Sequence, residues 1–265
     1  MDRQWRSICD AYMRCTSYSR SEMHLWDERP PYDRTQRAET YLTFPDAPRV
    51  ALGEPRFPEA PDLWKVLRQR RSLRNYTPEP LTLNQLNVLL WAGQGLTADL
   101  GDYQVRTAPS SGATFPSETF LFVHAVEGLK PGVYHLDVRG WALEQIAARS
   151  DMRAASCSAA LDQEAARVSA VNFVWTAVIE RCREKYYERA YRYLWWDSAH
   201  ISENVLLAAT AMGLGSCVMG AWYDDEVNAL CGIDGEEHTA VLFATVGRVA
   251  GQGWKEDRRP PPKAE

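Results

Sequence analysis

The sequence predicts an α+β protein in which helices flank a mainly antiparallel sheet. Short β-rich segments at 133–137 and 141–146 follow one another around turns, which is typical of an antiparallel meander. Amphipathic stretches with helix start and stop signals, such as 82–93 and 198–213, lie between groups of these segments. Helices interleaved with antiparallel strands favour the α+β class.

The first sixty residues differ from the rest, because prolines punctuate them and charges fill the spaces between. They predict an extension, residues 1–60, that wraps the core, with one helix before Tyr18 and no separate domain. The regular core is expected at 61–250, and 251–265 forms a charged, proline-rich tail.

The core is expected to begin with a helix at 62–68, where leucine and valine have helical spacing. In the next helix, at 82–93, Thr82 and Gln85 form a capping box, and Gly93 ends the apolar stripe. The same patterns predict helices at 151–170, 198–213 and 224–230, and strands at 119–126, 133–137, 141–146, 173–180, 216–219 and 239–246.

The composition excludes several classes of protein. Hydrophobic residues make up 45% of the chain, which allows a sizeable core and excludes wholesale disorder and a collagen-like fibre. The net charge of −5 argues against nucleic-acid binding by bulk electrostatics. The uncharged run at 204–222 is broken by Gly213 and Gly215, so it predicts a buried helix and strand and no membrane span.

The six cysteines are scattered without a C-x-x-C pair, so no metal site is expected. Reduced thiols, together with a polar N-terminus that lacks the apolar stretch of a signal peptide, predict a cytoplasmic protein.

A basic run is the first candidate binding motif. It places three guanidinium groups and a hydroxyl close together, on Arg70, Arg71, Ser72 and Arg74. The planar donor fork of arginine suits a phosphate dianion. The alternative is a solvated basic turn.

Two further motifs suit a flat ligand, because small residues let a ring approach the backbone. They are Pro109, Ser110, Ser111 and Gly112 in the first motif, and Met219, Gly220 and Ala221 in the second. A polar loop and a buried strand with a tight bend are the alternatives.

The fourth motif is the adjacent pair Lys185 and Tyr186. Both side chains transfer protons, and burial or a neighbouring cation can bring their pKa values from near 10 toward neutrality. The alternative is a solvated helix face with aromatic side chains reaching out from the core.

In this order, the motifs resemble the flavin-dependent nitroreductase superfamily, and most of all its SagB-type dehydrogenases, the azoline oxidases of thiazole/oxazole-modified peptide biosynthesis. The resemblance covers about residues 62–250. It rests on the strings RRSLRNYTPEPLTLNQLNVLLWAGQG, RTAPSSGATFPSETF, LKPGVYHLD, EKYYERAYRY, HISENVLLAATAMGLGSC and VGR.

The resemblance implies an α+β homodimer that binds FMN at its interface. The FMN phosphate would be held by Arg70, Arg71, Ser72 and Arg74, with Arg248 a further candidate. The ring would contact Met219, Gly220 and Ala221, and, from the partner subunit, the loop Pro109, Ser110, Ser111 and Gly112. Lys185 and Tyr186 match the Lys-Tyr pair that azoline-oxidising members need, one of them serving as the base that takes a ring proton.

The resemblance also implies a modified peptide as substrate and other enzymes of a biosynthetic cluster as partners. Two alternatives stay open. The first is an NAD(P)H-dependent reductase of nitroaromatic, quinone or dehydro-amino-acid substrates. The second is a flavin-binding or empty scaffold that docks partners in a biosynthetic complex.

Overall fold

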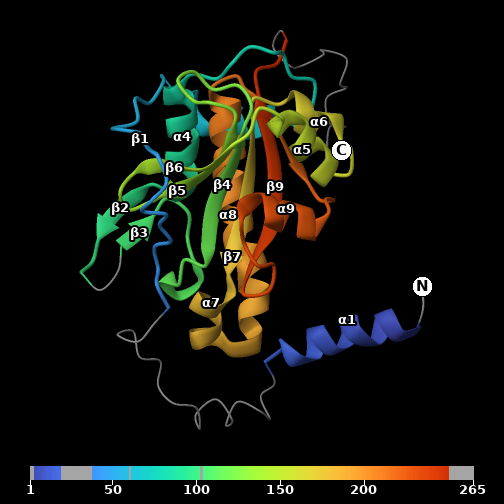
Figure 1. Ribbon diagram of the computed structural model, residues 1–265. Coiled ribbons are helices and arrows are strands. Elements are labelled where there is room, and N and C mark those ends of the chain that lie inside the picture. Colours follow the sequence, from blue (N-terminus) through green and yellow to red (C-terminus); the bar gives the residue numbers. More distant parts are fainter. Residues whose placement is uncertain (1–2, 19–37, 60, 102–103, 251–265) are drawn as a thin grey trace, which may run out of the picture.

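The computed structural model describes residues 3–18, 38–59, 61–101 and 104–250, with the side chains of the first helix described from Ile8 onward. In these ranges the central element is a seven-stranded sheet with the order β1-β6-β5-β4-β7-β9-β8 (Figure 1). Every neighbouring pair is antiparallel, which confirms the predicted class. The strands are β1 (Arg49–Ala51), β4 (Ser117–Val123), β5 (Gly132–Asp137), β6 (Ala142–Ala148), β7 (Val171–Val178), β8 (Gly215–Met219) and β9 (His238–Gly247).

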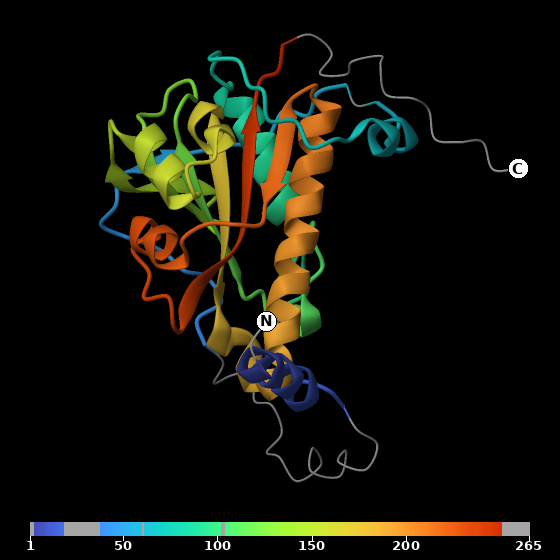
Figure 2. The same ribbon diagram turned by 90° about the vertical axis from the view of Figure 1, so that its right-hand side faces the viewer.

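Helices cover both faces of this sheet, as the edge-on view shows (Figure 2). One layer contains α4 (Leu83–Gln94) and the long α8 (Ala190–Ala211). The other layer contains α5 (Met152–Ala159), α6 (Glu164–Val168) and α9 (Asp224–Cys231).

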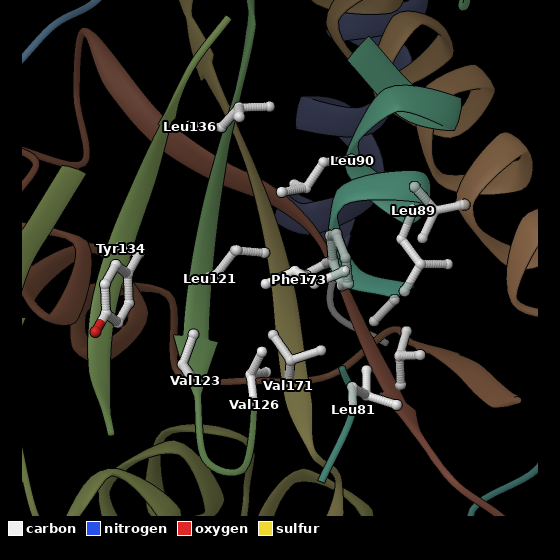
Figure 3. Packing of buried hydrophobic residues seen from close by; sticks show 14 of the residues in the cluster. Leu81, Leu89, Leu90, Leu121, Val123, Val126, Tyr134, Leu136, Val171 and Phe173 are labelled. Carbon is white, nitrogen blue, oxygen red and sulfur yellow. The ribbon is translucent and has the colours of Figure 1, made fainter. Parts of the chain in front are cut away.

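Alternation along the buried strands produces a separate core under each layer. Leu121 and Phe173 pack toward α4, where they meet Leu89 and Leu90 (Figure 3). Phe120 and Phe122 belong to the cluster on the other face, with residues of α5, α6 and α9. The sheet is therefore a rigid, two-sided scaffold.

Several local expectations are confirmed and others are corrected. Thr82 and Gln85 form the predicted capping box at the start of α4. The helix expected at 151–170 is instead two helices, because Leu161 and Asp162 both adopt φ of 55°, a left-handed conformation that ends a helix. A hairpin of β2 (Leu96–Asp99) and β3 (Gln104–Arg106) is an addition that the sequence patterns did not predict.

The N-terminal region contributes α1 (Arg3–Cys15), which confirms the helix expected before Tyr18, and the edge strand β1. Two arginines hold the end of α1. Arg189 Nη1 donates to the carbonyl of Thr16 at 2.8 Å, and Arg192 Nε donates to Thr16 Oγ1 at 2.7 Å.

Buried carboxylates hold the segment at 42–44, shortly before β1. Glu118 accepts from the amide of Leu42 at 3.3 Å, and Glu144 accepts from the amide of Phe44 at 3.1 Å. His135 lies between the two carboxylates, 3.1 Å from Glu118 and 3.0 Å from Glu144. The segment is thus anchored directly to charged groups inside the sheet.

In the described part of the chain, no helix is long and apolar enough to span a membrane. All six cysteines lie in that part and are unpaired. The predicted tail at 251–265 falls outside the described residues.

Candidate active site

The arginine motif lies along the open edge of the sheet. After α3 (Leu63–Gln69) the chain runs beside β8, with a parallel bridge between Ser72 and Ser216 and a 3.0 Å hydrogen bond from the Leu73 amide to the Ser216 carbonyl. Side chains alternate along an extended chain. The spacing therefore places Arg70, Ser72 and Arg74 on one side and Arg71 and Leu73 on the other.

The surroundings of these side chains agree with this division. Arg71 and Leu73 line a hollow of about 380 Å³ together with Lys65. Ser72 and Arg74 are exposed. Arg70 is half-buried, with Nε 3.6 Å from Glu203 of α8. Two guanidinium groups and a hydroxyl on one face are a donor set that fits a phosphate dianion.

The other end of β8, beyond the bridge at Ser216, leaves backbone accessible. The Met219 side chain is buried in the core beneath α9, so only its backbone can face a ligand. Gly220 is exposed, and a Cβ added there would meet no atom within 4 Å. Ala221 is also exposed, and its carbonyl accepts from Gln163 Nε2 at 2.8 Å. This open backbone fits a flat ring system.

Arg248 follows the last strand, but its guanidinium contacts the start of α4. Nε donates to the Pro80 carbonyl at 2.9 Å, and Nη2 donates to Gln85 Oε1 at 3.1 Å. The expected phosphate contact of Arg248 stays a prediction.

The serine-rich loop is fixed by one carboxylate of α8. Asp197, which is 2% exposed, accepts from the Ser110 hydroxyl at 2.6 Å and from the Ser111 hydroxyl at 2.9 Å. The Ser111 amide also donates to Asp197, at 3.0 Å to Oδ2. The loop leads into η2 (Ser111–Ala113) and has left-handed φ values of 59° at Gly112, 56° at Ala113 and 45° at Phe115.

Lys185 and Tyr186 pack directly against this loop. They end α7 (Ile179–Tyr186), and Lys185 Nζ donates to the Gly112 carbonyl at 3.0 Å. A Cβ added at Gly112 would collide with Tyr186 Oη and Lys185 Nζ. Tyr187, which opens η3 (Tyr187–Arg189), has φ of 51°. Left-handed backbone at non-glycine residues is costly and clusters at functional sites.

Aromatic side chains surround Tyr186. Its ring meets that of Tyr193 edge-on, with centroids 4.8 Å apart. Arg189 lies over the ring of Tyr18, 4.5 Å from its centroid. Burial and then a hydrogen bond with Tyr193 raise the pKa of Tyr18 to about 12. Tyr18, which follows α1, is therefore linked to Tyr186 through Tyr193.

A cavity of about 370 Å³ opens between the loop and the pair, lined among others by Pro109, Ser110, Gly112 and Lys185. Arg106 also lines this cavity; it is 7% exposed and donates to Gln94 at 2.9 Å. The string RTAPSSGATFPSETF begins at Arg106, but the sequence motifs predicted no role for Arg106 or for Asp197. The only signal for Asp197 was a charged residue at an inward position of an aromatic-rich helix.

The structure thus gathers the expected residues into two groups. The arginine motif lies near the C-terminal end of α8, next to α3, and the Lys-Tyr pair and serine loop lie near its N-terminal end (Figure 2). Asp197 contacts the serine loop, and Thr210 lines the hollow beside Arg71. At roughly 1.5 Å per residue, these two positions of α8 are about 20 Å apart along the helix axis.

Comparisons with known proteins agree with this geometry. The profile described as "Nitroreductase family" matches residues 67–248. "Putative nitroreductase MJ1384" of Methanocaldococcus jannaschii is 34% identical over 183 residues, covering 69% of this chain and 89% of that protein. The trifolitoxin-processing protein TfxB of Rhizobium leguminosarum bv. trifolii is 28% identical over 198 residues. That match covers 71% of this chain but only 48% of TfxB.

Two solved structures have the same fold. A nitroreductase-like protein of Anabaena variabilis has a TM-score of 0.67 at 27% identity, covering 77% of this chain and 42% of that chain. A chain of the E. coli microcin synthetase McbBCD complex, solved with truncated pro-MccB17 bound, has a TM-score of 0.62 at 20% identity. The match covers 95% of both chains.

The fold and the family match define a flavin-dependent oxidoreductase. The chain belongs to the nitroreductase family, as its sequence motifs indicated. Its cofactor is FMN, which a solved nitroreductase-like structure of this family contains. The donor face of the arginine motif and the open backbone at Gly220 fit the phosphate and the ring of that cofactor.

Proposed function

We propose that the protein is an FMN-dependent dehydrogenase that oxidises azoline rings in a modified peptide to thiazoles or oxazoles. The observation that carries the proposal is the contact of Lys185 and Tyr186 with the strained loop at Gly112. A peptide as substrate is supported by similarity to TfxB, which processes trifolitoxin.

In this reaction the ring loses one proton to a base and one hydride, which carries the two electrons. FMN, when bound, would supply the two-electron acceptor for the hydride. Lys185 or Tyr186 takes the proton from the ring carbon next to the carbonyl, which requires the neutral amine or the phenolate. The 3.0 Å hydrogen bond to Gly112 orients the Lys185 amine at the wall of the cavity.

We assign the cofactor contacts to the two groups of residues. The phosphate is held by Arg70, Ser72 and Arg74, with Arg71 and Arg248 at its margins, and Met219, Gly220 and Ala221 follow the ring. The loop of Pro109, Ser110, Ser111 and Gly112 completes the ring site from the partner subunit.

A homodimer is supported by the separation of the two groups along α8 and by apolar side chains at the surface. Trp64 is 69% exposed on α3, and Trp195 and Trp196 are each 49% exposed on α8. Exposed apolar patches of this kind mark interaction sites. A second copy that covers these helices would bring one group of residues toward the other.

Partner enzymes are a further part of the proposal. The structural relative McbBCD is a complex, and that supports assembly of this chain with the enzymes that form the azoline.

The decisive experiment compares variants of the proton-transfer pair. Lys185→Ala and Tyr186→Phe should retain FMN, while at least one of them loses dehydrogenation of a thiazoline peptide by about 10²–10⁴-fold, as for a lost acid–base group. Arg183→Ala, on the exposed side of the same helix, is the control. Full dehydrogenation by both variants would rule out the assignment.

A second candidate is an NAD(P)H-dependent reductase of nitro, quinone or dehydro-amino-acid substrates. It is favoured by the 34% identity to a protein named as a nitroreductase. Rapid bleaching of the bound flavin by NADPH, with quinone turnover undiminished in Lys185→Ala, would select this candidate.

A further inference from the structure

The Asp197 carboxylate accepts hydrogen bonds from two consecutive residues of the serine loop, Ser110 and Ser111. Oδ2 accepts from Ser110 Oγ at 2.6 Å and from the Ser111 amide at 3.0 Å. Oδ1 accepts from Ser111 Oγ at 2.9 Å and from the same amide at 3.1 Å. Both carboxylate oxygens thus bind the loop.

This carboxylate is buried, which is costly unless its charge is compensated. Burial raises the pKa of Asp197, and the hydrogen bonds from Ser110 and Ser111 oppose that rise. Among the described residues the loop donors supply most of the compensation, and the charge of His200 makes a smaller contribution in the same direction by lowering the pKa of Asp197. A buried carboxylate whose two oxygens both bind the same loop indicates a role in holding that loop in place.

The backbone conformation of the loop shows why it needs to be held in place. Three residues from Gly112 to Phe115 have left-handed φ, a conformation that persists only when surrounding contacts enforce it. Ser110 Oγ donates to Asp197 and also accepts from the Phe115 amide at 2.9 Å. Asp197 therefore fixes the hydroxyl that closes the loop.

The same loop orients Lys185. The carbonyl that accepts from Lys185 Nζ belongs to Gly112, directly after Ser111. The charges of Asp197 and Lys185 also act on one thiol. Burial raises the pKa of Cys182 and a hydrogen bond with Thr114 lowers it, while Asp197 raises it further and Lys185 lowers it. The carboxylate, the loop and the amine thus form one connected unit.

We propose that Asp197 is a positioning residue, which acts through Ser110 and Ser111 to hold the Gly112 carbonyl where it orients Lys185 for proton transfer. This inference rests on the proposed function, because it assigns Asp197 to the same reaction. Asp197 itself need not touch the substrate.

The test is a double-mutant cycle in the full-length, FMN-loaded protein. Asp197→Asn keeps the shape but turns one acceptor into a donor that faces donors of the loop. It should lower dehydrogenation of a thiazoline peptide by about 10–100-fold, the range seen for residues that orient a reacting group. In a Lys185→Ala background, the same change should lower the rate by less than about twofold.

Ser198→Ala is the matched control, because Ser198 is the next residue of α8 and its buried hydroxyl bonds Ser117 of β4 at 2.9 Å. It should retain the wild-type rate. If Asp197→Asn does not fold, the Ser110→Ala/Ser111→Ala variant removes the hydroxyl bonds from the loop side and should give the same non-additive loss.

Wild-type activity in Asp197→Asn, or an equal loss in both backgrounds, overturns the inference while the role of Lys185 stands. If Lys185→Ala is fully active while Tyr186→Phe is not, the positioning role falls and the proposed function stands with Tyr186 as the base. If both variants are fully active, the proposed function fails as well. Non-additivity together with unchanged FMN content supports the inference, since a merely structural role would lower both backgrounds alike.

Discussion

Arg181 and Glu118 form an ion pair inside the protein, with Nη1 and Oε1 2.5 Å apart and each side chain 3% exposed. Burial alone would raise the pKa of Glu118, but Arg181 and then His135 outweigh it and lower the pKa to about 2. Arg181 also donates to the carbonyls of Phe115 and Glu39. One guanidinium thus ties α7, the loop that contains Phe115 and the chain at Glu39 to the sheet.

Removing this guanidinium should therefore strongly lower the free energy of unfolding. Arg181→Met keeps most of the volume but leaves Glu118 buried without its main partner, which we expect to cost about 3–5 kcal/mol of unfolding free energy. Urea denaturation measures the change. Arg183→Met, which breaks an exposed pair with Glu180 on the same helix, should cost about 0–1 kcal/mol. Equal losses for the two variants would contradict the prediction.

Arg70→Ala and Arg74→Ala should each weaken FMN retention by about tenfold or more, because each loses a charge-assisted bond of roughly 1.5–3 kcal/mol. Quenching of flavin fluorescence during titration gives the affinity. Arg68→Ala, an exposed arginine of α3 outside the motif, is the control. Unchanged affinity in both variants would refute the phosphate assignment.

Gly112→Ala tests the contact between the loop and the proton-transfer pair. Gly128 offers a matched control, since its φ is 79° and an added Cβ meets nothing within 4 Å. Both substitutions carry the strain of left-handed backbone, about 1–2 kcal/mol, but only the first collides with Tyr186 and Lys185. We expect Gly112→Ala alone to lower dehydrogenation by about 10²-fold. Similar rates for the two variants would show that the contact is not needed.

Two buried histidines predict that the folded state loses stability in acid. Burial lowers the pKa of both His124 and His238 from 6.5 to about 4. Between those pH values the unfolded chain binds protons that the folded protein does not, so stability should fall as the pH drops from about 6.5 to 4. Urea midpoints across this range measure the slope, and His124→Gln should reduce it. A flat profile would contradict the prediction.

Light scattering should return twice the mass of one chain. Trp64→Glu and Trp196→Glu should shift the protein toward monomer, because each puts a charge into the apolar surface of α3 and α8. A wild-type monomer that retains FMN would refute the proposed homodimer.

Most of the fold could be predicted from local patterns. The capping box at Thr82 and the glycine after α8 mark helix ends by chemistry confined to a few neighbouring residues. The helix break at Leu161 could not be predicted, because two non-glycine residues adopt left-handed backbone there. The hairpin β2–β3 was missed because its strands are short and largely exposed, which leaves little apolar alternation.

Only part of the candidate site could be predicted from the sequence, because some of its contacts join residues that are far apart in the chain. When the hydrogen-bond donors are close in sequence, as from Arg70 to Arg74, the sequence alone predicts a shared binding motif. Asp197 lies far along the chain from Ser110 and Ser111, and only tertiary packing makes it their acceptor. Arg181 likewise looks like any charged helix residue until the fold buries it against Glu118.

The bridge between Ser72 and Ser216 has a consequence for solubility. β8 is the last strand of the sheet, and an open strand edge is a template for pairing with another molecule. Ser72 and Leu73 cover part of that edge, through the bridge and the hydrogen bond to Ser216. The segment that we propose to hold the cofactor phosphate thus also protects a strand edge, so loss of the cofactor should loosen the segment and favour edge-to-edge aggregation.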